Sequence, residues 1–175
     1  MGAEPTVHQP SVVQEGAVIG KDVVIGAFCF VASGAKIGAG TRIQSHTSVW
    51  ASVELGEDVF VGPAATFTNV KRPRAHLSRA PNWDRTHVGD GATIGAAAVL
   101  VAPVHVGARA MIGAGAVVTR DVPASAIAAG NPAVVIGFAC TCGERLFRGR
   151  RPKRAQCKHC GIRFAPDRHG GLHPV

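Results

Sequence analysis

Four of the five cysteines stand in two close pairs near the C-terminus. One residue separates Cys140 from Cys142, two separate Cys157 from Cys160, and fourteen lie between the pairs. Four thiolates can surround a zinc ion tetrahedrally, which leaves no open position for catalysis. The second pair has the usual knuckle spacing, and the first is one residue shorter. We expect a structural zinc rather than four free thiols, in a tail over residues 140–175 with a core of its own.

A second candidate for chemistry is the basic segment TNVKRPRAHLSRAPNWDRTH, which begins at Thr68. It contains Lys71, Arg72 and Arg74, and it also holds two histidines and a tryptophan. Long loops on rigid scaffolds often carry function. The alternative is a tolerated surface insertion. We therefore treat this segment as a candidate binding loop.

Four histidines are the candidates for a general base: His46, His76, His87 and His105. An imidazole titrates near neutral pH and can accept a proton from a reacting hydroxyl. His46 is the candidate of most interest, and its alternative is an ordinary surface histidine.

The elements that position these residues follow from a six-residue period. An aliphatic or aromatic residue recurs at every sixth position, and a small residue often stands two positions before it. The series is Val13, Ile19, Ile25, Val31, Ile37, Ile43, Val49, Leu55, Val61, Phe67, then Val88, Ile94, Leu100, Val106, Ile112 and Val118. This is the hexapeptide repeat of a parallel β-helix. Short strands with inward aliphatic side chains build a triangular prism whose turns cover one another.

The period also predicts the organisation of the chain. Three hexads make one turn, so sixteen hexads predict about five turns, with residues 1–12 as a cap on the first. The step from Phe67 to Val88 is 21 residues instead of six, so a loop over about 69–87 leaves the prism. We expect a β-helix domain over 1–139 and a basic, cysteine-rich tail over 140–175.

Charge is concentrated in the tail. Residues 1–143 hold ten Lys and Arg against nine Asp and Glu, whereas residues 144–175 hold nine against two. A nearly neutral prism with a solvated basic tail argues against nucleic acid as the partner. No apolar run approaches the ~20 residues of a membrane span, and no leader segment is visible. We expect a cytoplasmic protein.

Several motifs together resemble a known family. The segment from Ile94 to Gly137 includes GAGAVVTRDVP and AGNPA; VFVGPAATFTNVKRPRA stands upstream and GFACTCGERL downstream. They resemble the coenzyme A-dependent hexapeptide acyltransferases, and among these the N-acetyltransferases of nucleotide-linked amino sugars, such as UDP-2-acetamido-3-amino-2,3-dideoxyglucuronate. The resemblance implies a left-handed β-helix, acetyl-CoA as cosubstrate, a nucleotide amino sugar as acceptor, and a homotrimer with active sites between subunits.

The resemblance also implies roles for particular residues. Asn69, in FTN, would stand at the reacting end of the pocket and orient the acceptor amine. Arg74 would pair with a substrate diphosphate or carboxylate, and Lys71 and Arg72 are weaker candidates for the same anion. The coenzyme would lie along the prism edge at corner residues, which here are Ala96, Ala114, Thr119 and Arg120.

Two departures from the family pattern keep other functions open. Relatives read similarly to IQNNVSVYEGV where this chain has IQSHTSVWASV, from Ile43 to Val53, and many carry Arg or Lys where this chain has Val134. The first change replaces an Asn by His46 and removes a Glu. The alternatives are an acyltransferase acting on another amine or a hydroxyl in natural-product or surface-polysaccharide biosynthesis, and a non-catalytic β-helix subunit of an assembly.

Overall fold

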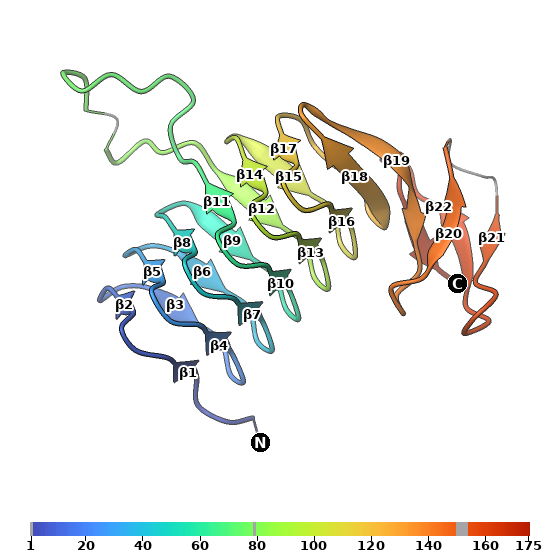
Figure 1. Cartoon of the computed structure of the whole chain (residues 1–175), viewed down its shortest axis with the longest axis horizontal. Helices are drawn as coiled ribbons and strands as arrows, with labels where there is room; N and C mark the ends of the chain where they lie inside the picture. The colour runs from blue at the N-terminus through green and yellow to red at the C-terminus, as the bar shows by residue number, and fades with distance from the viewer. Residues whose placement is uncertain (1, 79, 150–153) are drawn as a thin grey trace.

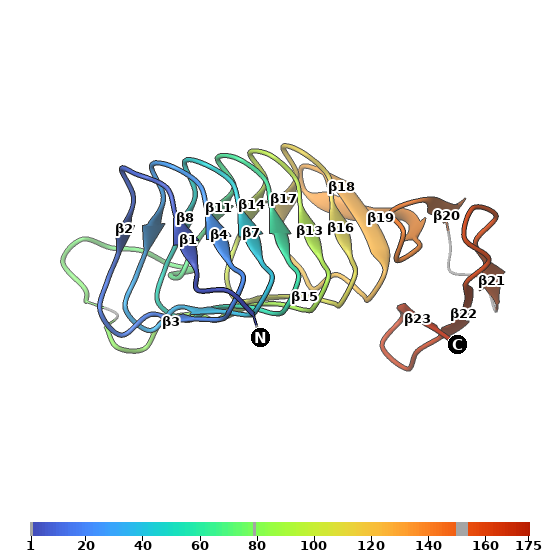
Figure 2. The same cartoon turned by 90° about the horizontal axis from the view of Figure 1, so that it is seen from below.

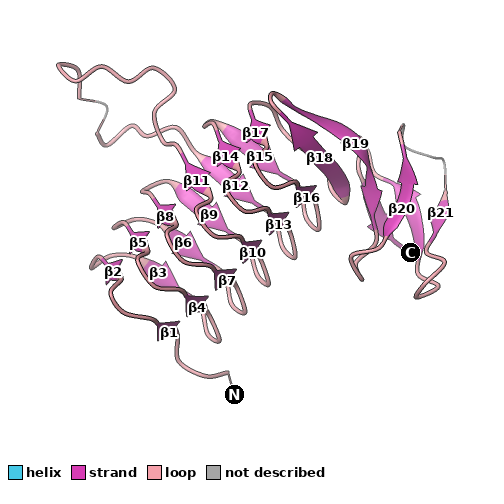
Figure 3. Cartoon of the chain, viewed as in Figure 1, coloured by secondary structure: helices cyan, strands magenta, loops and turns pink. Residues whose placement is uncertain are grey.

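A computed structural model describes residues 2–78, 80–149 and 154–175 of the chain. Within these ranges every regular element is a strand, and no helix occurs. The chain winds into stacked turns, a loop leaves the stack, and the C-terminal strands stand beyond its end (Figures 1 and 3). The parallel β-helix predicted from the hexads is confirmed.

Three parallel sheets form the sides of the prism. The first sheet runs through β1 (Thr6–Val7), β4 (Val24–Ile25), β7 (Arg42–Ile43), β10 (Phe60–Val61), β13 (Thr93–Ile94), β16 (Met111–Ile112) and β18 (Ala126–Gly130). The second contains β2 (Val12–Val13), β5 (Phe30–Val31), β8 (Ser48–Val49), β11 (Thr66–Phe67), β14 (Val99–Leu100) and β17 (Val117–Val118). The third contains β3 (Val18–Ile19), β6 (Lys36–Ile37), β9 (Val53–Leu55), β12 (Thr86–Val88) and β15 (Val104–Val106).

The register of the ladders explains the period. Each strand from β1 to β14 pairs with the strand three elements further on, as when Val31 faces Val49 and Ile37 faces Leu55. The second residue of each pair points inward, and from Ile25 onward these side chains are buried. Val13 is still 37% exposed, because no turn covers it on the N-terminal side. Stacking of neighbouring turns therefore buries the core (Figure 2).

The number of turns and the N-terminal cap differ from the sequence-based expectation. The first sheet holds seven successive parallel strands, so the β-helix has about seven turns rather than five. Residues 1–12 are not a separate cap, because Thr6 and Val7 pair with Val24 and Ile25 as the first strand of the ladder. Val7 stands six residues before Val13 and continues the register, but Pro5 takes the place of the small residue and His8 the place of the glycine that mark other hexads.

The tail covers the C-terminal end of the prism. β19 (Ala133–Ala139) and β20 (Arg145–Arg148) extend the first sheet antiparallel, and β21 (Ala155–Gln156), β22 (Arg163–Pro166) and β23 (Leu172–Pro174) form a separate small sheet. The Ser125 hydroxyl donates to the Leu172 carbonyl at 3.0 Å, and the Leu172 N–H donates to the Ala124 carbonyl at 3.0 Å.

The tail is not the separate core that we expected. Phe164 and Leu172 are fully buried and belong to the same apolar cluster as the β-helix side chains. The open end of a parallel β-helix exposes both apolar side chains and unpaired strand edges. The tail therefore continues the core and protects that end.

Candidate functional site

The candidate site residues lie at the corners of the prism. We call the corner between the first and second sheets the first corner, and the corner between the second and third sheets the second corner. Asn69 follows β11 at the second corner, whereas His46 lies between β7 and β8 at the first. The structure of one chain therefore does not bring these two candidates together.

The coenzyme candidates divide in the same way. Ala96 and Ala114 follow β13 and β16 at the first corner, where the Ala96 carbonyl accepts the Gly115 N–H at 2.8 Å. Thr119 and Arg120 follow β17 at the second corner, and both are exposed. All four therefore flank the second sheet, two at each edge.

The outer face of that sheet carries no charged side chain. Its outward residues, from the first turn to the last, are Val12, Phe30, Ser48, Thr66, Val99 and Val117. The outer face of the third sheet differs, since Lys36 forms an ion pair with Glu54 at 2.9 Å and His87 lies against His105 with ring centroids 4.8 Å apart. The outer face of the second sheet is therefore less polar than that of the third sheet.

The basic loop leaves the second corner between β11 and β12, over residues 68–85. Its base is held by Asp84, whose N–H donates to the Asn69 carbonyl at 2.9 Å and whose Oδ2 accepts the Lys71 N–H at 2.6 Å. The Thr68 hydroxyl accepts the Ala102 N–H at 2.9 Å and ties the same base to the next turn. Asn69 is therefore fixed in its main chain and half-buried.

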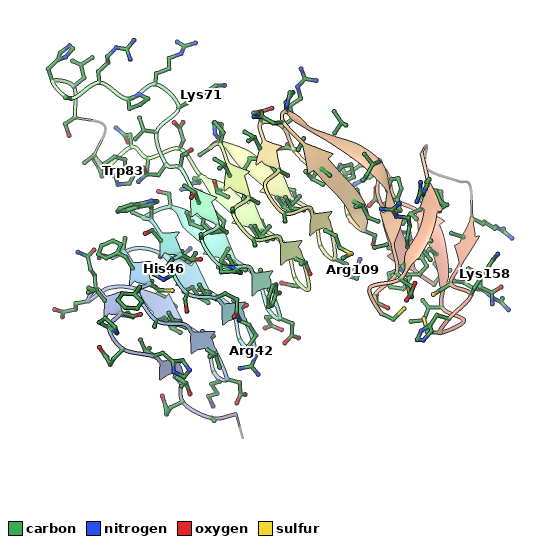
Figure 4. The ribbon with its side chains drawn as sticks, in the orientation of Figure 1. Arg42, His46, Lys71, Trp83, Arg109 and Lys158 are labelled. Atoms are coloured by element: carbon green, nitrogen blue, oxygen red, sulfur yellow. The ribbon has the colours of Figure 1, made fainter. Side chains whose placement is uncertain are left out.

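The three cationic candidates on this loop do not share one cavity. Lys71 and Arg72 line a polar hollow of about 290 Å³ together with Asn82 and Asp84. Arg74 lines another, of about 360 Å³, with Leu77 and Trp83. Figure 4 shows Lys71 and Trp83 on the loop, away from the body of the prism. The loop thus offers its cations to a partner or ligand outside the prism.

His46 stacks on another ring. Its imidazole lies parallel to the Phe28 ring, with centroids 4.9 Å apart and an interplanar angle of 4°. Both residues have positive φ, +64° for His46 and +58° for Phe28. Sequence reasoning missed this stack and the His87–His105 contact. The signal was present, because the members of each pair stand eighteen residues apart, which is three hexads.

The four tail cysteines converge as predicted. Cys140 follows β19, Cys142 precedes β20, Cys157 follows β21 and Cys160 precedes β22. Their sulfur atoms all lie within 4.8 Å of one another, with Sγ–Sγ distances of 3.4 Å between Cys140 and Cys160 and 3.7 Å between Cys142 and Cys157. A tetrahedral site with Zn–S bonds of about 2.3 Å places its sulfur atoms about 3.8 Å apart. The cluster therefore fits a zinc ion.

The main chain also favours a thiolate in this cluster. The backbone N–H groups of Cys160 and His159 lower the pKa of the Cys157 thiol to about 6. Amide donors of this kind stabilise a negatively charged sulfur, which is the metal-binding form. The fifth cysteine, Cys29, is buried in the prism as expected, and burial raises the pKa of its thiol.

Comparison with known proteins identifies the repeat. The profile of the bacterial transferase hexapeptide (six repeats) matches residues 16–49 and 85–120. The dTDP-3-amino-3,6-dideoxy-alpha-D-galactopyranose 3-N-acetyltransferase of Aneurinibacillus thermoaerophilus is 41% identical over 65 residues, which cover 37% of this chain and 34% of that protein. This chain thus spans about a third of the length of that curated relative.

Solved structures with the same fold bind coenzyme A. The acetyltransferase domain of PglB from Neisseria gonorrhoeae, in complex with acetyl coenzyme A, superposes with a TM-score of 0.66 at 25% identity, covering 77% of this chain and 58% of that one. A variant of GDP-perosamine N-acetyltransferase from Caulobacter crescentus, in complex with CoA and GDP-perosamine, gives 0.66 at 28% identity, covering 78% and 58%.

These comparisons agree with the repeats, the corner geometry and the topology of the sheets. The described residues contain no helix that is long and apolar enough to cross a membrane. The hexapeptide profile matches two segments that together make up less than half of the chain, and the similar solved structures include an acetyltransferase domain and a GDP-perosamine N-acetyltransferase.

Proposed function

We propose that the chain is an acetyl-CoA-dependent N-acetyltransferase that acts on the amino group of a nucleotide-linked amino sugar. The observation that carries the proposal is the similarity, over 78% of this chain, to a GDP-perosamine N-acetyltransferase solved with CoA and GDP-perosamine. The corner residues Ala96, which is half-buried, and Ala114, which is exposed, support it, because the family motif places them beside the coenzyme. Acetyl-CoA and the sugar nucleotide are substrates here, and zinc is the cofactor that the four tail cysteines would hold.

The division of the site between two corners supports a homotrimer. In a threefold arrangement with the second sheet turned toward the axis, the first corner of one subunit meets the second corner of its neighbour. Ala96 and Ala114 of one chain then share a cleft with Asn69, Thr119 and Arg120 of the next. The uncharged outer face of the second sheet is suited to burial between subunits.

Acetyl transfer to an amine does not require a strong general base from the protein. The neutral amine attacks the thioester carbonyl, a C–N bond forms, the C–S bond breaks, and the amine proton leaves with the coenzyme thiolate as a thiol. Hydrogen-bond donors must stabilise the tetrahedral oxyanion, and the nucleophile must be held in line. Asn69 supplies an amide at the base of the loop for that positioning. Arg74, Lys71 and Arg72 supply cations for the phosphates or a sugar carboxylate.

We infer a cytoplasmic location from the cysteines and the substrates. The sulfur atoms of the tail are free thiols suited to metal binding rather than disulfides, and thiols persist in a reducing environment. Acetyl-CoA and sugar nucleotides meet this enzyme in the cytoplasm.

The placement of the coenzyme has a direct steric test. Replacement of the exposed Ala114 by tryptophan should abolish coenzyme binding, because the bulky side chain fills the corner along which the coenzyme lies. The β-helix should remain folded, since the inward residues of this turn are unchanged. Isothermal titration calorimetry with acetyl-CoA measures the affinity, and circular dichroism checks the fold. An unchanged affinity in a folded variant contradicts the placement.

The acceptor can be found by screening. Nucleotide-linked amino sugars are incubated with the protein and acetyl-CoA, and release of free thiol is followed. We expect turnover with at least one amino sugar and none with the corresponding sugar that bears a hydroxyl at the same carbon. Turnover of hydroxyl acceptors alone favours an O-acyltransferase. The absence of turnover and of coenzyme binding favours the non-catalytic assembly subunit.

A further inference from the structure

The stack of rings at the first corner spans two turns and stops at the third. Phe28 and His46 occupy the same position in successive turns, and Ala64 occupies it in the next. The N–H of His46 donates to the Ala27 carbonyl and that of Ala64 to the Ser45 carbonyl, both at 3.0 Å. Ala64 also has a positive φ of +57°. A ring at position 64 would therefore stand over His46 as His46 stands over Phe28.

Because position 64 carries only a methyl group, one face of the His46 ring is covered and the other is not. The turn-to-turn spacing of about 4.8 Å matches the 4.9 Å between the Phe28 and His46 centroids. On the other side of His46, no ring of the described residues takes up that spacing. The open face can accept a planar group that the protein itself does not provide.

The composition of the stack is hard to explain by stability alone. A left-handed backbone is unfavourable for a bulky residue such as phenylalanine, and Phe28 leaves 59% of its surface exposed. An exposed aromatic side chain held in a strained position is a common feature of binding surfaces. The left-handed conformation itself recurs at corners of the prism, for example at Asp22, Asp58 and Ala97. What distinguishes this corner is that two successive turns carry rings there, parallel to each other, in the arrangement on which nucleobases stack.

We propose that Phe28 and His46 form a platform on which a heteroaromatic base stacks, in the space over Ala64. This proposal rests on the proposed function, which supplies two such bases: the nucleobase of the sugar nucleotide and the adenine of coenzyme A. Adenine can reach the site because Ala96 and Ala114 lie at the same corner in the following turns. The nucleobase of the sugar can reach it because the proposed trimer brings Asn69 of a neighbouring chain to this corner. His46 then binds a base by its ring face and is not the proton acceptor.

The sharpest test adds a third ring to the stack. In Ala64→Phe a third ring occupies the space of the ligand, and the backbone already has the conformation that Phe28 and His46 adopt. The variant should remain folded, which its thermal midpoint checks, while the affinity for the base-bearing ligand falls at least about fivefold, which is the lower end of the range for base–aromatic stacking. His46→Leu removes the platform and should weaken binding to a similar extent. Calorimetry on the full chain measures both.

Three probes identify the base. They are dTDP, coenzyme A and 4′-phosphopantetheine, which lacks the adenine nucleotide. Loss of dTDP affinity alone assigns the platform to the sugar nucleotide, and loss of coenzyme A affinity alone assigns it to adenine. Phosphopantetheine affinity should not change in either case. Asp58→Phe is the matched control, because it adds a ring at a left-handed position, φ +53°, of a different corner, and it should leave all three affinities unchanged.

Two results overturn the platform. One is an Ala64→Phe protein that binds dTDP and coenzyme A as tightly as the wild type. The other is a loss of binding accompanied by a change in oligomeric state, measured by light scattering, which would mean that the rings pack against another subunit. A wild-type protein that binds neither dTDP nor coenzyme A overturns the proposed function and the platform with it.

Discussion

Asn69→Ala is expected to lower kcat/KM for the amino-sugar substrate by about 10²-fold, the cost of misplacing a nucleophile by about 1 Å. Asp84 and Thr68 hold the main chain on both sides of Asn69, so the alanine variant should keep the loop in place. The loss should fall mainly on kcat, because the missing amide misplaces the nucleophile rather than weakening contacts with the nucleotide.

His46→Ala is the comparison that separates amine from hydroxyl chemistry. An amine loses its proton with little help, so this variant should cost less than Asn69→Ala. Its cost should appear in KM, because it removes the ring of the Phe28–His46 stack on which we propose that the base binds. A hydroxyl acceptor reverses the order, since a general base typically contributes ~10²- to 10⁴-fold. Steady-state kinetics on the best substrate decides between them. A dominant loss of kcat in His46→Ala overturns the choice of an amine acceptor and the role given to the His46 ring.

The sequence predicted the β-helix because its signal is local and repeated. Each hexad places one aliphatic residue inward, and the structure buries that residue in every turn from Ile25 to Val118. The convergence of the four cysteines was predictable for a different reason: two closely spaced pairs of thiolates are a typical set of zinc ligands. The first turn was missed because Thr6–Val7 lacks the small residue and the glycine that mark the other hexads.

The parts that could not be predicted are contacts that follow no period. Asn69 and His46 stand 23 positions apart, so a turn of eighteen residues places them at different corners, but the repeat does not show how the loop after Asn69 is held. The part that Asp84 plays in holding the base of the loop could not be predicted either, because its hydrogen bonds to Asn69 and Lys71 close a loop that follows no period. Contacts between the tail and the last turn span 47 residues and have no sequence signature.

The second large effect concerns the zinc cluster. Cys157→Ser should reduce the metal content from about one zinc per chain to a small fraction of that, because a hydroxyl is a poor substitute for a thiolate. In small zinc-dependent folds the metal supplies about 10–16 kcal/mol of apparent binding free energy, which is also folding free energy. The tail sheets formed by β20 to β23 should therefore lose their order, while the turns from β1 to β17 keep theirs.

The shared core predicts how far this disorder spreads. Because Leu172 bonds to Ala124 and Ser125 and its side chain is fully buried, loss of the tail should also expose the last turn of the prism. Hydrogen exchange should then show lost protection over 140–175 and weakened protection over 124–130, with the earlier turns unchanged. Cys29→Ala is the control: it removes a thiol from the prism and should leave the zinc content intact. Protein prepared under reducing conditions without a chelator that contains no zinc, or a Cys157→Ser variant whose tail stays protected, establishes instead that the four thiols are free and that the tail folds by apolar packing alone.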